Sequence, residues 1–478
     1  MAPVTIITAG MQQFGAPSSP DSARKTGTSA GLVLIYSADF EKLQPAYLLN
    51  VHQVFIGRDP ACAICVPERA VSRKHAMIGF EVDRWVLRDL GGSNGTMVDG
   101  RFVNEVELEH HQELRVGDTV FKYVQTGAET YAGYRIDGTM VAGAVRRCGA
   151  LVELAGGSLI DRIGAQLERI APVELSVVIE GESGTGKEIV AREIHRMSGR
   201  RGPMQAVNCA AIPANLIESE LFGYKRGAFS GADRDKLGLV ASAHNGTLLL
   251  DELGDMPLEA QAKLLRVLQS KEVYPLGATS GHKVDVRVIS ATNRDLGRLV
   301  REGKFRGDLL SRLNEFQIAL PPLRERKEDI LLLSRALLSR HGCGHLRISF
   351  PFMLALIHYD WPYNVRELEA CLKRAAALAE GDLLEARHLP ESLREAMIGY
   401  GTRRTDDSPA PPRTSSEPPG PSEPPRQRAQ PPSEDQLRAL LAQHRGNVAA
   451  VGRVLGKERM QIHRWMQRYG IAVSDYRS

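Results

Sequence analysis

The chain has 478 residues, so we expect it to fold as several domains rather than one. Its net charge of +4 is small for this length and by itself indicates no partner. No apolar run reaches about 18 residues, which argues against a membrane span, and the first residues lack the basic start and long apolar core of a secretory signal. Six scattered cysteines suit a reducing compartment, so we expect a cytoplasmic protein.

Residues 1–29 are rich in Ser, Pro, Gly and Thr, and we expect them to form a flexible N-terminus. From residue 30 to residue 125 the texture changes to short runs of β-type residues, such as LVLIY, QVFIGR and RWVLRDL, separated by turn signals. Many short strands with regular turns predict an all-β sandwich.

Three polar spots fall in the predicted turns of this sandwich, at residues 57–58, 72–75 and 92–96. They bring an arginine, a hydroxyl and an amide onto loops, where binding groups tend to lie. Such a set suits a phosphate and the peptide backbone beside it. The alternative is that these residues merely form turns, and for the SNG turn taken alone that reading is favoured.

In this order and spacing, the three spots resemble the forkhead-associated (FHA) domain, which reads phosphothreonine peptides. The resemblance covers about residues 31–124. It implies that Arg58 and Ser72 hold the phosphate, with Arg73 assisting. It also implies that Asn94 holds the peptide backbone, with Ser93 beside it.

Two further features of this domain are read as structural. His75 matches a family position that looks structural, so we expect a buried histidine that makes hydrogen bonds. Cys62 and Cys65 form a C-x-x-C pair, but neither a second pair nor a histidine cluster is spaced to complete a metal site. We therefore expect no metal centre there.

Residues 126–155 are small and glycine-rich, and we interpret them as a linker. Beyond them strands and helices alternate, which predicts a parallel α/β sheet. A buried strand at 177–179 leads into a glycine-rich turn, and a helical pattern follows at once. Strand, glycine loop, lysine and helix together form a cradle for nucleotide phosphates. The predicted ATP-binding residues of this loop are Gly181, Glu182, Ser183, Gly184, Thr185, Gly186, Lys187 and Glu188.

Two acids and one amide follow later strands of the same pattern. The strand TLLLDE ends in Asp251 and Glu252, where an ATPase places acids at the carboxyl edge of its sheet. Asp251 can hold Mg²⁺ through water, and Glu252 can orient and deprotonate the attacking water. The strand VRVISATN ends at Asn293, which is placed to sense the γ-phosphate and to help position the water. Glu188 stands where a hydroxyl usually holds magnesium, so the loop alone is an incomplete signal.

Residues 156–397 resemble the AAA+ domain, with its helical lid, of bacterial enhancer-binding proteins, the activators of sigma-54 RNA polymerase. The resemblance is carried by GESGTGKE, VNCAAI, ELFGYKRGAFSGA, GTLLLDELGD, DVRVISATN, GKFRGDLLSRLN, LPPLRERKEDI and WPYNVRELE. In this family a glutamate follows the lysine of the phosphate loop, as Glu188 does here. The resemblance therefore implies an ATPase that uses ATP and Mg²⁺.

The resemblance also assigns roles outside the loop. Asn208 would be a switch residue that holds Glu252 until the nucleotide is correct. Arg306 and Arg312 match candidate arginine fingers, which act on a neighbouring subunit and so imply a hexameric ring. Arg366 matches the lid arginine that senses the nucleotide.

One loop combines two glycines and small residues around a single aromatic side chain. Two readings stay open from the residues: an exposed contact surface, or a turn whose aromatic ring folds back into the core. The family motif is GAFTGA, and the resemblance implies that this loop touches sigma-54. Serine replaces threonine here, which keeps the hydroxyl and leaves open that the sigma-54 coupling has been lost. The loop is Gly227, Ala228, Phe229, Ser230, Gly231 and Ala232.

Residues 398–432 are dominated by proline and charge, and we expect a disordered linker. Residues 433–478 return to helical patterns, with a short turn before a basic last helix, which predicts an all-α helix-turn-helix. The residues GN, LG and YGI, in this order along the segment, resemble the Fis-type tail of the same activators. One face, containing Ile462, Trp465, Met466 and Tyr469, should be core. The candidate DNA contacts are Arg459, Gln461, His463, Arg464 and, for a phosphate, Arg468.

The leading interpretation is an ATP-dependent transcription activator that binds enhancer-like DNA as dimers, senses phosphothreonine and remodels sigma-54 RNA polymerase in a hexameric ring. No aspartyl-phosphate receiver is apparent, so the input implied is a Ser/Thr kinase pathway. The alternative is a phosphopeptide-responsive DNA-binding regulator whose ATPase no longer activates sigma-54.

Overall fold

The computed structural model describes residues 29–142, 144, 154–403 and 434–444, together with 451, 462, 466, 469 and 471. The chain divides into two compact units, 1–408 and 409–478, which are considered separately. In the described part of the chain no helix is both long enough and apolar enough to cross a bilayer.

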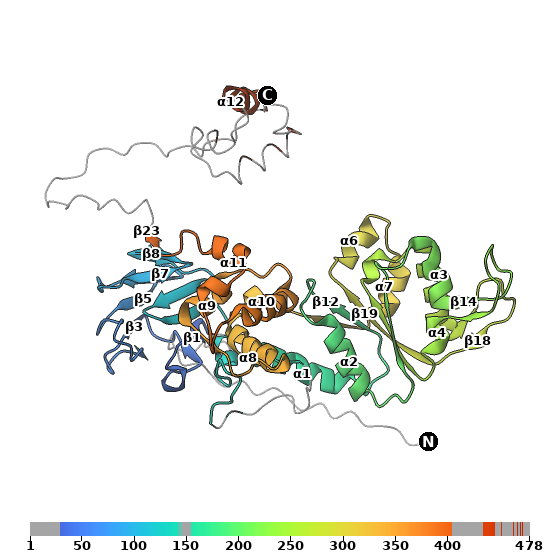
Figure 1. Cartoon of the computed structure of the whole chain (residues 1–478), viewed down its shortest axis with the longest axis horizontal. Coiled ribbons are helices and arrows are strands. Elements are labelled where there is room, and N and C mark those ends of the chain that lie inside the picture. Colours follow the sequence, from blue (N-terminus) through green and yellow to red (C-terminus); the bar gives the residue numbers. More distant parts are fainter. Residues whose placement is uncertain are drawn as a thin grey trace, which may run out of the picture. The chain divides into compact units, whose positions relative to one another are not determined.

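The first part of the larger unit is a β-sandwich, drawn in blue in Figure 1, as expected for an FHA fold. One sheet runs in the order β2 (Ala46–Leu48), β1 (Gly31–Tyr36), β11 (Thr119–Val124), β10 (Glu113–Val116), β7 (Thr96–Val98), β8 (Arg101–Val103) and β23 (Thr402–Arg403). The other runs β4 (Ile64–Cys65), β3 (Gln53–Gly57), β5 (Ala76–Glu81), β6 (Arg84–Asp89) and β9 (Glu105–Glu107). Apolar side chains of both sheets meet in one core that includes Leu32, Ile56, Ile78, Leu87, Leu114 and Phe121.

Strand β11 departs from the usual alternation of a sandwich strand, because all six of its residues are buried. One face lies in the sandwich core, and the other is covered by segments from later in the chain. One of these is the short helix η2 (Ala128–Tyr131), which lies in the segment interpreted as a linker. Ala128 and Tyr131 pack with Val33 and Val124, so the first part of that segment belongs to the packed structure.

Strand β23 comes from the far end of the larger unit and joins the FHA sheet. It pairs in parallel with β8, Thr402 opposite Arg101 and Arg403 opposite Phe102. In Figure 1 it lies beside the blue strands β8 and β7 although some 300 residues separate them in the chain.

The ATPase core is a parallel five-stranded sheet, as predicted from the alternating pattern. Its order is β13 (Met204–Asn208), β16 (Gly246–Asp251), β19 (Val286–Thr292), β12 (Val177–Glu180) and β20 (Phe316–Ala319). Helices α1 (Ser158–Ile170) and α2 (Lys187–Met197) pack on one face, with Val177 and Ile179 beneath them. The other face carries α3 (Ala214–Phe222), α5 (Leu258–Ser270) and α7 (Gly307–Leu313). All carboxyl ends of these strands therefore meet at one edge of the sheet.

Short elements complete the core: α4 (Leu239–Ser242), α6 (Leu296–Arg301) and the hairpins β14 (Gly223–Tyr224) with β15 (Lys236–Leu237) and β17 (Glu272–Val273) with β18 (His282–Lys283). The helical lid follows as α8 (Ile330–Arg340), α9 (Phe350–His358), α10 (Asn364–Leu378) and α11 (Glu391–Ala396), with one short parallel pair, β21 (Arg347–Ile348) and β22 (Leu383–Leu384). The α/β core with a helical lid confirms the predicted AAA+ architecture.

The smaller unit contains α12 (Glu434–Gln443) and a small apolar cluster. Ile462 and Met466, two residues of the predicted core face, are buried in it with Leu437 and Leu441. Trp465 and all the candidate DNA contacts (Arg459, Gln461, His463, Arg464 and Arg468) lie outside the described residues.

Candidate functional site

The phosphate loop connects the end of β12 to the start of α2. Gly184 and Gly186 have φ of 80° and 107°, a left-handed conformation that side chains other than glycine rarely adopt. The Lys187 ammonium turns into the loop and donates to the carbonyls of Gly181, at 2.8 Å, and Glu182, at 3.2 Å. Burial lowers the pKa of Lys187, against the opposing charges of Glu252 and Asp251. The loop thus presents one cation and a row of main-chain amides to the same space.

The two acids lie at the carboxyl edge of the sheet, as predicted. Asn208 and Asp251 are register partners on the adjacent strands β13 and β16, and the Asn208 amide donates to Asp251 Oδ2 at 3.1 Å. The resemblance implied that Asn208 holds Glu252, and here the structure differs. Glu252 comes one residue after the strand, has φ of 50°, and turns its carboxylate to within 3.9 Å of Lys187 Nζ.

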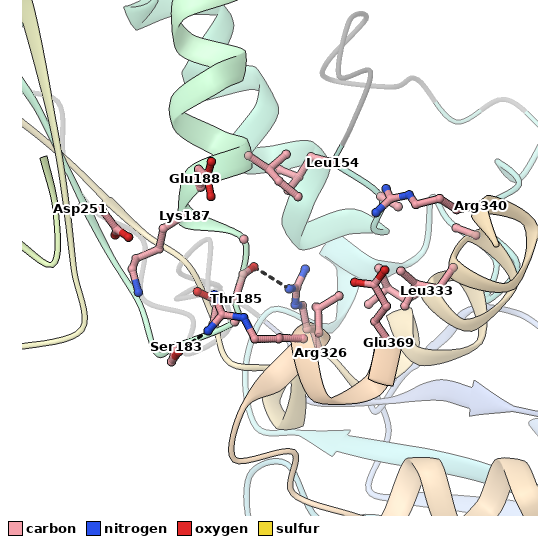
Figure 2. Close-up of a pocket in the computed structure, with 18 of the residues that line it drawn as sticks. Leu154, Ser183, Thr185, Lys187, Glu188, Asp251, Arg326, Leu333, Arg340 and Glu369 are labelled. Carbon is pink, nitrogen blue, oxygen red and sulfur yellow. Dashed lines mark hydrogen bonds between the residues drawn. The ribbon is translucent and has the colours of Figure 1, made fainter. Parts of the chain in front are cut away.

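These groups line a cavity of about 390 Å³. In Figure 2, Lys187 and Asp251 lie on one side of the phosphate loop, and Arg326, Arg340 and Glu369 come from the lid side. Apolar side chains of the lid helices close part of the cavity, among them Leu333, Leu337 and Val365. A volume with phosphate-binding groups at one end and apolar walls at the other suits a nucleotide.

The lid is joined to the phosphate loop by a set of hydrogen bonds. Arg366, the predicted lid arginine, donates to Ser183 Oγ at 3.1 Å. The fully buried Asn364 donates to the Ser183 carbonyl at 3.0 Å and to Glu182 at 3.2 Å. Arg324 grips both carboxylate oxygens of Glu182, at 2.9 and 2.7 Å. The lid is therefore closed on the loop.

Sequence reasoning gave no role to Arg324, Arg326 or Asn364, although all three lie in motifs that carry the resemblance. Arg326 is 2% exposed and donates to the Thr185 carbonyl at 3.3 Å, the dashed contact between these two residues in Figure 2. The only available signal was that the motif LPPLRERKEDI places charged residues directly after an apolar start. Their partners, the carboxylate of Glu182 for Arg324 and the carbonyl of Thr185 for Arg326, lie in a loop far earlier in the chain and come within reach only in the folded lid.

Three predicted residues lie away from the cavity. The described residues that line it do not include Asn293, Arg306 or Arg312. Asn293 is exposed directly after β19. Arg306 caps the start of α7 and pairs with Asp308 at 2.7 Å, and Arg312 is exposed on the same helix.

The loop Gly227–Ala232 follows β14 and is closed by a hydrogen bond from the Gly227 amide to the Ala232 carbonyl at 2.8 Å. Phe229 is 44% exposed, and its ring centroid lies 4.9 Å from that of Tyr224 in an edge-on contact. The ring is thus supported from one side and open on the other. Neither open reading holds completely, because Phe229 is neither free in solvent nor folded into the core.

In the FHA domain the three polar spots come together around His75, which is fully buried as expected. His75 Nδ1 accepts from the Ser72 amide at 3.1 Å, and its Nε2 lies 3.0 Å from the Gly95 carbonyl. The Arg58 amide donates to the Ser72 carbonyl at 3.0 Å. His75 therefore links residues 72–75 to residues 92–96. The hydrogen bond between main-chain groups of Arg58 and Ser72 links residues 57–58 to residues 72–75.

The side chains expected to hold a phosphopeptide remain available. Arg58, Arg73, Ser93 and Asn94 are exposed and Ser72 is half-buried. Asn94 also donates to the Ala70 carbonyl at 2.7 Å, which fixes its loop. The close approach of the first two spots requires Gly57, because a Cβ there would lie 2.1 Å from the Arg73 carbonyl oxygen.

Family models match three parts of the chain. Residues 156–319 match the sigma-54 interaction domain, 324–404 the AAA+ ATPase lid domain and 54–117 the FHA domain. The ATPase core belongs to the sigma-54 interaction domain family. None of these three matches extends into the C-terminal unit.

Several transcription regulators are similar to this chain over long segments. The chain is 42% identical over 312 residues to the regulatory protein AtoC of Escherichia coli, covering 64% of this chain and 65% of AtoC. It is 52% identical over 222 residues to the DNA-binding transcriptional regulator NtrC of Azospirillum brasilense, covering 46% of each. A crystal structure of NtrX from Brucella abortus in complex with ATP is 31% identical, with a TM-score of 0.49, over 67% of this chain and 70% of that one. The chain thus spans less than two thirds of the length of the curated relatives it matches.

Proposed function

We propose that the protein is an ATP-dependent transcription activator that acts on sigma-54 RNA polymerase. The observation that carries this proposal is the meeting of Lys187, Asp251 and Glu252 with the lid arginine Arg366 around one cavity in a sigma-54 interaction domain. Lys187 and the loop amides bind the phosphates, and Arg366 of the lid senses the bound nucleotide. Glu252 orients the attacking water and takes its proton.

Magnesium fits the donor set at this edge of the sheet. Asp251 is a carboxylate at the mouth of the phosphate loop, and the described residues hold no cluster of three His, Cys, Asp or Glu that would cage a transition metal. Such an arrangement suits Mg²⁺, which keeps several waters and binds mainly to one carboxylate and the phosphates. Mg²⁺ bound there would neutralise phosphate charge.

Hydrolysis would depend on a neighbouring subunit. Arg306, directly before α7, and Arg312, on α7, lie away from the cavity of their own chain. Residues that act on a neighbour's nucleotide must lie in such a place. An arginine supplied in this way is worth about a thousandfold or more in rate. We therefore propose a hexameric ring as the active form, assembled from DNA-bound dimers.

The output and the inputs lie at separate places. The loop Gly227–Ala232, with its half-exposed Phe229, would touch sigma-54, and ATP hydrolysis would move it to remodel the polymerase. The FHA domain would bind a phosphothreonine protein through Arg58, Ser72 and Asn94, and the tail would bind enhancer-like DNA in the cytoplasm. The kinase pathway would thus act through the FHA domain.

An open-complex assay with sigma-54 polymerase tests the proposal. Wild-type protein with ATP should open a sigma-54 promoter, and Phe229→Ala should lose opening while it keeps ATP turnover. ATP turnover by the wild type without promoter opening would favour the alternative, a phosphopeptide-responsive DNA-binding regulator that no longer engages sigma-54. Ser230→Thr, which restores the missing methyl group, should not reduce opening.

A further inference from the structure

Two opposite charges lie side by side on one face of the FHA sheet. Glu113 of β10 and Lys122 of β11 are register partners in an antiparallel pair. Glu113 is 1% exposed and Lys122 is 0% exposed. Burying charged groups this completely is unfavourable unless each finds close partners. The partners of both side chains come mainly from the lid.

Lys122 is enclosed by a short segment that enters the lid. Its ammonium donates to Glu328 Oε2 at 2.6 Å and to the Glu325 carbonyl at 2.7 Å. It also lies 4.9 Å from the ring centroid of Tyr131, a cation–π contact. Two of the three ammonium hydrogens thus depend on the segment Leu323–Asp329, which we call the lid strap.

Glu113 is enclosed by the strap and by other parts of the lid. It accepts from Tyr400 Oη at 3.0 Å, and it lies 3.8 Å from Lys327 Nζ and 3.5 Å from His358 Nδ1. Burial opposes its ionisation, yet the pKa of Glu113 is lowered because His358, Lys327 and Tyr400 favour the carboxylate. Both charges of the FHA sheet are therefore matched by lid residues.

The same strap reaches the nucleotide site on its other side. Arg324 grips Glu182 of the phosphate loop and Arg326 donates to the Thr185 carbonyl. Asp329, at the end of the strap, accepts from the Gly157 amide at 2.7 Å, directly before α1. Within seven residues, the strap thus contacts the phosphate loop through two arginine side chains, and it contacts the FHA sheet through the Glu325 carbonyl and the side chains of Lys327 and Glu328.

We propose that the FHA domain is a working part of the nucleotide lid: Lys122 and Glu113 hold the lid strap in the position from which Arg324 and Arg326 reach the phosphate loop, and this tightens nucleotide binding. The two FHA residues are positioning residues. The inference rests on the proposed binding of a nucleotide in the cavity, and it goes further because it makes a phosphopeptide domain part of that binding.

Phosphopeptide binding is compatible with this docking. The loop with Ser93 and Asn94, which would bind the phosphopeptide, ends at Gly95 directly before β7, and both of these side chains are exposed. The end of the lid meets the β7–β8 hairpin at its turn, where the Gly401 amide donates to the Gly100 carbonyl at 2.6 Å, and β23 then pairs along the outer edge of β8 as far as Phe102. One domain can therefore carry a phosphoprotein at one end and hold the lid at the other.

The test measures binding of a fluorescent ADP analogue to the full-length protein. Lys122→Met and Glu328→Gln should each raise the dissociation constant for the analogue by roughly tenfold or more. The exposed Lys42→Met is the matched control and should stay within about twofold of wild type. The charge exchange Lys122→Glu with Glu328→Lys should recover most of the lost affinity, which a merely structural disturbance would not allow.

Binding of a phosphothreonine peptide is measured on the same variants to show that the FHA domain is folded. If Lys122→Met binds the peptide and its ADP-analogue affinity is unchanged, the inference is wrong. If Lys122→Met does not bind the peptide, the lid variant Glu328→Gln is used to test the inference instead. Unchanged ADP-analogue affinity in Glu328→Gln also overturns the inference, and a tenfold loss of affinity supports it. Lys187→Ala is the control that should bind no ADP analogue. If the wild-type protein also binds none, the proposed nucleotide binding itself is contradicted.

Discussion

The buried guanidinium of Arg326 donates to the main-chain oxygen of Thr185 across 3.3 Å, so a lid arginine holds the backbone of the phosphate loop. The same guanidinium lies 3.9 Å from Asp329, and both side chains are 2% exposed. Burial lowers the pKa of Arg326 and raises the pKa of Asp329. Each group is therefore tolerated inside the protein largely because of the other.

Arg326→Ala should destabilise the larger unit by about 3–5 kcal/mol, because it leaves a carboxylate buried without its counter-charge. It should also raise the KM for ATP more than it lowers kcat, since Arg326 contacts the loop rather than the reacting atoms. Urea unfolding and steady-state ATPase assays measure the two effects. Arg335→Ala, at an exposed position in α8, is the control and should change stability by no more than about 0.5 kcal/mol.

Glu252→Gln should separate nucleotide binding from hydrolysis. The amide keeps the shape of the side chain near Lys187 but cannot accept a proton, so ATP should bind while turnover falls by about a hundredfold or more. Equilibrium binding of ATP and phosphate release are the measurements. Glu259→Gln, exposed in the first turn of α5, is the matched control, and equal turnover in the two variants would remove Glu252 from the mechanism.

Arg58→Ala should weaken binding of a phosphothreonine peptide by about 10- to 100-fold, the usual range for losing one charge-assisted hydrogen bond. Isothermal titration with phosphorylated and unphosphorylated peptides is the measurement. Arg84→Ala serves as the control because Arg84 pairs with Glu107 on the surface of β6, outside the three polar spots. If both variants bind the phosphopeptide as tightly as wild type, Arg58 does not hold the phosphate.

His111 should make the FHA domain sensitive to acid. Burial, Lys122, the stacked ring of His110 and Lys327 lower the pKa of His111 to about 4 from its ordinary 6.5. Below pH 6.5 the unfolded chain gains a proton that the folded ring resists, so this contribution to stability is complete above pH 6.5 and is lost as pH falls toward 4.

The measurement is urea unfolding of wild type and His111→Asn between pH 7.5 and pH 4.5. Asparagine accepts the left-handed backbone at this position, where φ is 72°. The wild type should lose about 1–2 kcal/mol more than the variant across this range, less than the full pKa shift would give because solvent screens a half-buried ring. Parallel curves for the two proteins would contradict the prediction.

The ATPase chemistry could be read from the sequence because it follows local patterns. Lys187, Asp251 and Glu252 each stand directly at the end of an apolar strand or glycine turn, and parallel strands bring those ends to one edge. The direction in which each side chain points at that edge could not be predicted from the sequence. Asn208 faces its register partner Asp251, whereas Glu252 has a left-handed backbone that turns its side chain away from Asn208. These directions depend on backbone geometry rather than on residue spacing.

The docking of the FHA domain was not visible in the sequence. Glu113 and Lys122 look like the polar positions of alternating strands, which ordinarily face water. Their burial follows from partners more than 200 residues away, Glu325, Glu328 and Tyr400. Alternation predicts which side chains share a face of the sheet, but only the folded chain determines what covers that face.

The pairing of β23 with β8 has a mechanical consequence for a protein that would hold DNA by its tail. Arg403 is the last residue of β23, so tension arriving along the chain from the C-terminal side meets the FHA sheet before it meets the lid helices. A pull along the axis of β23 would load the hydrogen bonds between β8 and β23 in shear. The sheet would then act as an anchor that shields the nucleotide site from forces on the tether, up to the load at which this short strand peels away.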